Sequence, residues 1–130
     1  MHKRHAYSAG SEFEKTFGFS RAVRMGSWIA VSGCTAARTE GGPVGGADVV
    51  AQTRECLRRV EAALDALGAS MSAVVRTRFF VTDITAWPQI GSVHAEFFGD
   101  LNPASTIVEV SRLALPELLV EVEADAVLRL

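Results

Sequence analysis

Three carboxylates alternate with apolar residues along a short stretch near the C-terminus. In LLVEVEADAVL (118–128) they are Glu121, Glu123 and Asp125, each two positions from the next. On a β-strand such residues share one face and lie about 7 Å apart. A carboxylate buried on this face would have a raised pKa and could act as a general acid or base. A solvated strand face is the alternative, and the pattern leaves open which carboxylate is ionised.

A pairing arginine would change that chemistry, and five arginines lie in segments that resemble strands: Arg21, Arg24, Arg76, Arg78 and Arg112. Such a pair, or catalytic use of the carboxylate, is favoured where a sheet face is buried in an oligomer. Hydrophobic residues make up 48% of the chain, which is a high share for a small monomer. The composition therefore favours apolar surface buried between subunits.

A hydroxyl and an imidazole are the next candidates for chemistry. Ser105 opens the strand-like segment NPASTIVEV (102–110), on a face that it shares with Ile107 and Glu109. His94 falls on the apolar stripe of an expected helix. A histidine there is more often a hydrogen-bonded core residue than a catalyst, although it titrates near neutral pH.

Ser32, Gly33 and Cys34 close an expected strand, where polar groups can meet a ligand. We expect Cys34 to be more exposed than Cys56, which lies in an apolar helical stripe and is expected to fill the core. No Cys/His/Asn set can be assembled, so a nucleophilic thiol is disfavoured. The cysteines and histidines lack metal-ligand spacing, and no glycine-rich phosphate motif occurs, so we expect neither metal nor cofactor.

Charge and hydropathy exclude several classes of protein. The formal net charge is −2 and no basic run exceeds two residues, which disfavours nucleic-acid binding. No apolar run approaches the roughly 20 residues that span a bilayer, and residues 1–15 lack the apolar region of a signal peptide. We therefore expect a cytoplasmic protein that has no membrane partner.

The elements that must position these residues follow from periodicity. Residues 1–16 are polar, and we expect them to be loosely ordered. Residues 20–33 predict two strands around a turn at Met25-Gly26-Ser27. Asp48 is expected to cap a helix that runs to about Leu67 and stops at Gly68.

The second half of the chain continues this alternation. A strand is predicted at 74–83, with Val75 on its apolar face. A second helix follows, with Thr85 as its cap and Pro88 in its first turn. Strands are predicted at 105–113 and 118–128, separated by a turn at Pro116.

The predicted order is therefore β-β-α-β-α-β-β in one domain that spans residues 1–130. This order is typical of an α+β protein in which a mixed sheet carries two helices on one face. The other face must be covered, and a partner subunit is the obvious cover.

Several segments together resemble the RidA/YjgF family, once called L-PSP endoribonucleases. These segments are VSG (31–33), VVRTRFFVTD (74–83), HAEFF (94–98), NPASTIVEVSRL (102–113) and LVEVEADAV (119–127). The resemblance runs from about Phe17 to Leu128. It implies a chorismate-mutase-like fold and a homotrimer with three clefts between subunits. It also implies hydrolysis of small reactive imines or enamines to keto acids and ammonia, without a cofactor.

The resemblance assigns roles to particular residues. The glutamate that activates water falls on Glu121, and the serine-glycine pair of the pocket falls on Ser32 and Gly33, with Cys34 beside them. A pocket tyrosine of the second helix falls on His94.

Two family residues are missing. The arginine that holds the substrate carboxylate falls on Ser105, which Thr106 and Ile107 follow in the expected pocket, and a second tyrosine falls on Phe19. Arginine offers a charged fork where serine offers one neutral hydrogen bond. Either another arginine, with Arg21 or Arg24 as first candidates, replaces it, or the substrate is not an anionic imino acid.

Three functions remain in view. The first is a trimeric hydrolase or deaminase in which Glu121 orients water. The second is a trimer that binds or senses a small metabolite without chemistry, which the missing arginine and tyrosine favour. The third is an endoribonuclease, which ranks lowest because the charge is acidic and no His/Lys/Arg cleavage set is recognisable.

Overall fold

The computed structural model describes residues 3–129 of the chain. Its strands form one six-stranded sheet in the order β1-β2-β3-β6-β4-β5. All neighbours in this sheet are antiparallel except β4 and β5, which are parallel. The strands are β1 (Arg4–Tyr7), β2 (Ala22–Met25), β3 (Trp28–Cys34), β4 (Val74–Val81), β5 (Ala104–Glu109) and β6 (Val120–Val127).

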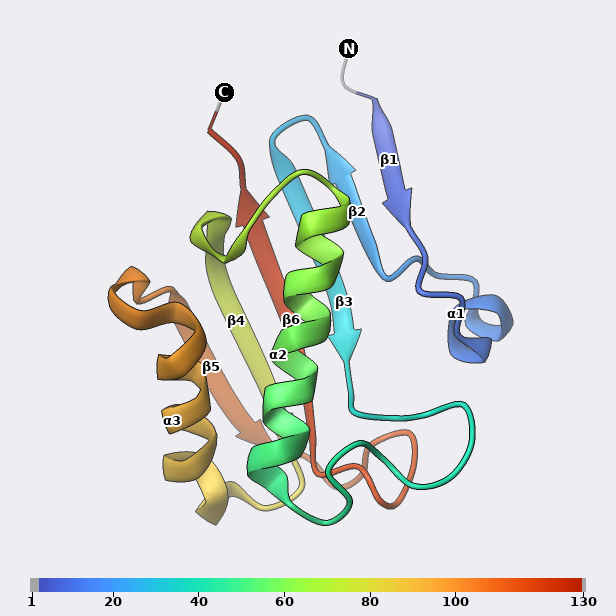
Figure 1. Cartoon of the computed structure of the whole chain (residues 1–130), viewed down its shortest axis with the longest axis vertical. Helices are drawn as coiled ribbons and strands as arrows, with labels where there is room; N and C mark the ends of the chain where they lie inside the picture. The colour runs from blue at the N-terminus through green and yellow to red at the C-terminus, as the bar shows by residue number, and fades with distance from the viewer. Residues whose placement is uncertain (1–2, 130) are drawn as a thin grey trace.

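Two long helices, α2 (Val49–Ala66) and α3 (Trp87–Phe98), lie side by side over one face of this sheet (Figure 1). Short 3₁₀ turns are η1 (Met71–Ala73), η2 (Ile84–Ala86) and η3 (Gly99–Leu101). The mixed α+β architecture with two helices on one face is therefore confirmed. No helix within residues 3–129 has the length and apolar character needed to cross a membrane.

Helix α2 forms where the sequence predicts it. Asp48 caps it by accepting hydrogen bonds from the amides of Val50 and Ala51, and it ends before Gly68, which has φ +83°. Its stripe of apolar side chains, including the fully buried Leu57 and Leu64, packs on the sheet. Burial of an aliphatic side chain of this kind stabilises the fold by about 1.5–3 kcal/mol.

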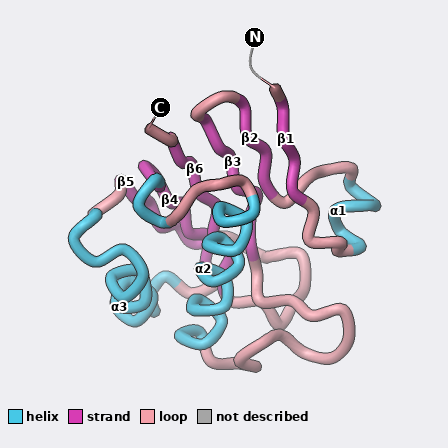
Figure 2. Tube along the Cα trace, turned by 45° about the horizontal axis from the view of Figure 1, so that its top comes forward, coloured by secondary structure: helices cyan, strands magenta, loops and turns pink. Residues whose placement is uncertain are grey.

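The N-terminal segment differs from expectation. The described residues before 17 are not a loose tail, because β1 pairs with β2 and a short helix, α1 (Glu12–Phe17), follows it. Ser11 and Glu14 form a capping box, a signal that is visible in the sequence. Figure 2 shows α1 at the edge of the sheet, apart from the other two helices. Residues 1–2 lie outside the described residues.

Three local predictions in the second half are wrong. Val75 is exposed and Val74 is buried instead, because the register between β4 and β6 shifts between Val74 and Arg76. Asp83 rather than Thr85 caps the turn before α3, since its carboxylate accepts the Thr85 amide. Strand β5 also ends at Glu109 rather than at 113, where it stops pairing with β4.

Gln52 of α2 holds the loops that lead into the site. Its side chain is fully buried, and its Nε2 donates to the carbonyls of Gly46 (2.7 Å) and Glu117 (3.0 Å). Its Oε1 accepts the amide of Leu119 at 2.9 Å. These bonds fix the start of β6 because Leu119 immediately precedes it, and they therefore position Glu121 two residues further on.

The sheet face away from α2 and α3 is not covered by any described element. We name it the open face. The strand registers place on it the exposed side chains of Met25, Trp28, Val108 and Val127 together with the carboxylates of β6. An exposed apolar surface of this kind is typical of an interaction surface.

Candidate functional site

Glu121 lies directly against the backbone of Gly33. A Cβ atom added to Gly33 would be 2.0 Å from Glu121 Oε2, so only a glycine leaves room for the carboxylate. The pairing of β3 with β6 produces this contact. From Val31 to Cys34 the strand β3 advances three residues, while β6 advances two, from Ala124 to Val122. The extra residue is a bulge that brings Gly33 to Glu121.

Burial controls the acidity of Glu121. Burial raises its pKa, the Arg21 charge opposes the rise, and the Glu123 charge adds to it. A carboxyl with a raised pKa is easier to protonate and serves better as a proton acceptor and donor near neutral pH. This environment fits the predicted general acid-base role.

Arg21 is the cation of this region. Its guanidinium donates to the Gly33 carbonyl and lies 3.8 Å from a Glu14 carboxylate oxygen. It also lies 5.3 Å from the centre of the Phe19 ring, which places Phe19 beside the group. We call Phe19, Arg21, Ser32, Gly33, Cys34 and Glu121 the Glu121 cluster.

The second arginine candidate points elsewhere. Arg24 lies on the helix side of β2, where it donates to the carbonyls of Gly26 (2.9 Å) and Leu67 (2.8 Å). Ser32 uses its hydroxyl to donate to the Ser20 carbonyl at 2.7 Å. The side chain of Ser32 therefore joins two strands.

Cys34 is buried, with 1% of its surface exposed against 0% for Cys56, so the expected difference in exposure between the two thiols is almost absent. The bulge in β3 turns its side chain toward the core. Burial raises the pKa of the Cys34 thiol, although the Arg21 charge opposes the rise. A thiol with a raised pKa is a poor nucleophile. This agrees with the prediction that Cys34 does not act as one.

The other two carboxylates of β6 share one arginine from the neighbouring strand. Arg78 Nη1 lies 3.3 Å from Glu123 Oε1 and 3.2 Å from Asp125 Oδ2. The pairing arginine expected for this face is thus supplied within the chain. Glu121 differs from its two neighbours, because the positive charge that acts on its pKa is that of Arg21.

A second group of polar side chains surrounds Ser105. Thr77 of β4 donates from Oγ1 to Ser105 Oγ at 2.8 Å, and the same Thr77 oxygen lies 3.0 Å from His94 Nε2. Thr77 is fully buried and Ser105 is exposed. We call these three residues the Ser105 chain.

The imidazole of His94 is held between two rings. The centres of the Phe79 and Phe98 rings lie 5.5 and 4.5 Å from the centre of His94. Burial lowers the pKa of His94, which favours neutral imidazole at pH 7. Sequence reasoning did not select Thr77, because the pairing of β4 with β5 that joins it to Ser105 is not visible in the sequence.

The two groups lie on opposite faces of the sheet. Thr77 pairs with Ala124, whose side chain is buried under the helices, whereas Phe80 pairs with Glu121 on the open face. Ser105 lies beside Thr77, and so it shares the helix side with Ile107, which is partly buried beside Phe79. One chain therefore does not bring Ser105, His94 and Ile107 to Glu121.

Thr106 is the one predicted residue of β5 on the open face. It pairs with Arg78, the partner of Glu123, and its side chain is exposed.

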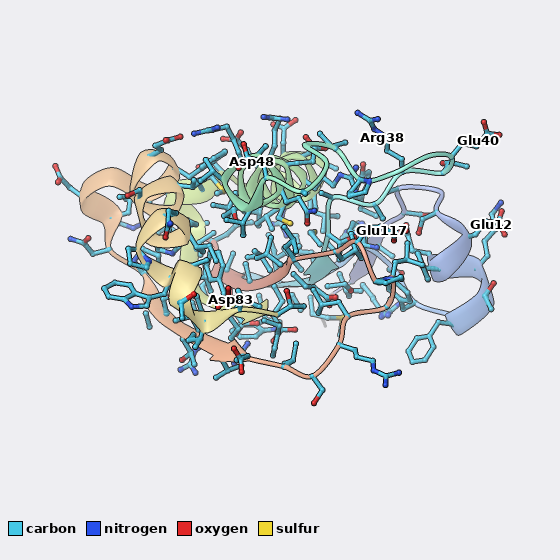
Figure 3. All side chains as sticks on the ribbon, turned by 90° about the horizontal axis from the view of Figure 1, so that it is seen from below. Glu12, Arg38, Glu40, Asp48, Asp83 and Glu117 are labelled. Atoms are coloured by element: carbon cyan, nitrogen blue, oxygen red, sulfur yellow. The ribbon has the colours of Figure 1, made fainter. Side chains whose placement is uncertain are left out.

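A cleft of about 530 Å³ adjoins the Glu121 cluster on the helix side and was not expected from the sequence. Tyr7, Phe13, Arg21, Cys34 and Arg59 are among its lining residues. The charged Glu12 and Arg38 also line it, and Arg38 points away from the body of the molecule (Figure 3). No three His, Cys, Asp or Glu side chains within residues 3–129 gather as a metal site.

Comparison with known proteins gives a family for this fold and site. The family model described as Endoribonuclease L-PSP matches residues 10–128. A solved structure from Mycobacterium tuberculosis, titled as a member of the YjgF/YER057c/UK114 family, superposes with a TM-score of 0.89 at 48% identity and covers 97% of this chain and 100% of its own.

Curated relatives agree with this match. A RutC family protein of Pyrococcus abyssi is 33% identical over 83% of this chain and 84% of its own length. The 2-iminobutanoate/2-iminopropanoate deaminase of Escherichia coli is 34% identical over 85% of this chain and 88% of its own length. The fold is thus that of the small α+β proteins of the YjgF/YER057c/UK114 family. The chain belongs to the RidA/YjgF family.

Proposed function

We propose that this protein is a cofactor-independent hydrolase that deaminates a small reactive imine or enamine, or a related labile C–N metabolite. The observation that carries the proposal is the position of Glu121. Its carboxylate lies against the Gly33 backbone, and burial raises its pKa. The deaminase relatives, at 33–34% identity, support this class of reaction.

The chemistry needs one group that moves a proton. Water adds to the C=N carbon as Glu121 accepts one of its protons, and Glu121 returns this proton to the nitrogen to give the neutral carbinolamine. Glu121 then accepts the proton of the carbinolamine hydroxyl and delivers it to the nitrogen as the C–N bond breaks. The products are the carbonyl compound and ammonia, and the carboxylate is restored.

We further propose that the protein acts as a homotrimer with clefts between subunits. The apolar side chains of the open face support burial against another subunit. The separation of the Glu121 cluster from the Ser105 chain also supports it. A cleft that combines β3 and β6 of one subunit with β5 of the next would bring both groups to one substrate.

A second candidate is a trimer that binds a metabolite without converting it. The observation in its favour is Ser105, which stands where the resemblance expects a charged arginine. A neutral hydrogen bond contributes about 1 kcal/mol against about 1.5–3 kcal/mol for a charge-assisted one. RNA cleavage has no comparable support, because the net charge is −2.

The test uses 2-iminopropanoate generated in the cuvette by an amino-acid oxidase. We expect the wild-type protein to accelerate formation of the keto acid, and Glu121→Gln to lower the rate roughly 100-fold or more. Glu123→Gln, on the same strand face, is the matched control and should retain most of the activity. Light scattering checks that each variant keeps the assembly state of the wild type.

If Glu121→Gln is as active as the wild type, the mechanism is wrong. If the wild-type protein binds a keto acid but accelerates nothing, the metabolite-binding candidate replaces the hydrolase.

A further inference from the structure

The hydrogen bonds of the Ser105 chain have a direction. A threonine hydroxyl carries a single proton. Thr77 donates that proton to Ser105 Oγ at 2.8 Å, so its 3.0 Å contact with His94 must be donated by the imidazole Nε2–H. The order is therefore His94 to Thr77 to Ser105. Among residues 3–129, no group accepts the hydrogen of Ser105 itself, and its side chain is exposed.

A hydroxyl at the end of such a chain is a better donor than an isolated one. Each bond polarises the next, because the group that accepts one hydrogen bond donates its own proton more strongly. Thr77 is fully buried, so the middle of the chain is shielded from water. If His94 takes up a proton, the positive charge acts on Ser105 through the Thr77 hydroxyl.

We infer that His94, Thr77 and Ser105 form a relay that binds a carbonyl or carboxylate oxygen of the ligand, and that protonation of His94 strengthens this contact. The inference rests on the proposed function for placing the substrate at Ser105. Ser105 touches the oxygen, whereas Thr77 and His94 are positioning residues. The relay thus partly replaces the charged hydrogen-bond donor that is missing at position 105.

The surroundings of His94 leave the ligand as the main source of charge near the relay. Phe79 of β4 and Phe98 of α3 flank the ring. The charged groups on the elements packed against α3, and on the Ser105 face of β5, are engaged or exposed. Arg54 of α2 pairs with Glu96, and Asp83 accepts from Thr85. The exposed Glu109 of β5 accepts the Ile84 amide at 3.1 Å, and Asp100 lies in exposed η3. Burial is the cause of the lowered His94 pKa.

The sign of the coupling follows from linkage. An anionic oxygen at Ser105 stabilises imidazolium over imidazole, so it raises the pKa of His94. The same coupling makes the ligand bind more tightly as the pH falls through that pKa. An apolar side chain in place of Thr77 has no hydroxyl, so it breaks the path and removes the coupling.

The test is a ¹⁵N NMR titration of the His94 ring in the full-length protein, with and without pyruvate as the probe. His94→Gln assigns the signals. We expect an Nε2–H tautomer in the free protein above the pKa, and an upward shift of the His94 pKa with pyruvate. Thr77→Ser keeps the hydroxyl and should keep the shift, whereas Thr77→Val, which has nearly the same shape, should lose it.

Three results would overturn the relay: an unprotonated Nε2 in the free protein, a pyruvate-induced shift that persists in Thr77→Val, or no shift at saturating pyruvate. None of them depends on turnover. A loss of the relay is therefore distinguishable from a failure of the Glu121 mechanism, which the activity of Glu121→Gln reports.

Discussion

The Glu121 cluster and the Ser105 chain occupy the two faces of one sheet, and burial acts on them in opposite directions. Burial raises the pKa of Glu121 and lowers the pKa of His94, because in both cases it disfavours the charged form. The cluster places a proton acceptor against the backbone, while the chain presents a hydrogen-bond donor at the sheet edge. One subunit thus carries two complementary groups, which the proposed assembly would bring to one substrate.

Gly33→Ala is the substitution that we expect to disrupt the Glu121 cluster most. The new methyl group would occupy the position of Glu121 Oε2, so the carboxylate must turn away. We expect turnover to fall roughly 100-fold or more, as for loss of a general base. Stability in urea should change little, since a side chain and not the backbone moves.

Gly91→Ala is the matched control for that substitution. A Cβ at Gly91 meets nothing within 4 Å, and Gly91 lies in the exposed surface of α3. It should keep full activity and gain about 1 kcal/mol in stability from helix propensity. Full activity of Gly33→Ala would show that the contact between Gly33 and Glu121 is not part of the reaction.

A positive charge introduced at position 105 tests the role of the Ser105 chain. Ser105→Arg replaces a neutral donor by a charged fork. If the cleft receives a carboxylate, kcat/KM for 2-iminopropanoate should rise roughly 3- to 30-fold, from about 0.5–2 kcal/mol of added interaction. Ser105→Lys, which has charge without the fork, should gain less. A rate below the wild type with an intact assembly would indicate that the natural ligand places no carboxylate there.

The smallest effect concerns the charges of the open face. The Glu123 charge raises the pKa of Glu121, so Glu123→Gln should lower that pKa. The acidic limb of the rate profile should then move to lower pH, and ¹³C NMR of the Glu121 carboxyl checks the same shift directly. Glu117→Gln removes an exposed carboxylate before β6, and it should change neither the pKa of Glu121 nor the acidic limb of the rate profile. An unchanged Glu121 pKa in Glu123→Gln would show that burial and the Arg21 charge set it without Glu123.

Local patterns in the sequence predicted much of the fold. The cap at Asp48, the stop at Gly68, the turn at 25–27 and the alternating faces of β6 are confirmed, because each depends on neighbours within a few residues. The N-terminal strand escaped prediction because its four residues, RHAY, have no apolar alternation and gain their place from pairing with β2. The capping box at Ser11 and Glu14 was a usable signal for the helix that follows.

For the candidate site, too, some features follow from the sequence and others only from the folded structure. The sequence by itself determined which chemical groups the protein carries: the carboxylates of β6, the Ser32-Gly33 pair, and a serine at position 105 in place of an arginine. It also determined the two faces of β6, since alternation is a local property of the chain.

Only the tertiary structure decided which of these groups meet. The bulge in β3 sets Gly33 against Glu121 and turns Cys34 inward, and the parallel pairing of β4 with β5 sets Thr77 between Ser105 and His94. These contacts join residues far apart in the chain, and a shift of one residue in register would move every side chain to the other face. Register arises from the packing of the whole sheet, which is why the neighbours of Glu121 and Ser105 could be read only from the folded protein.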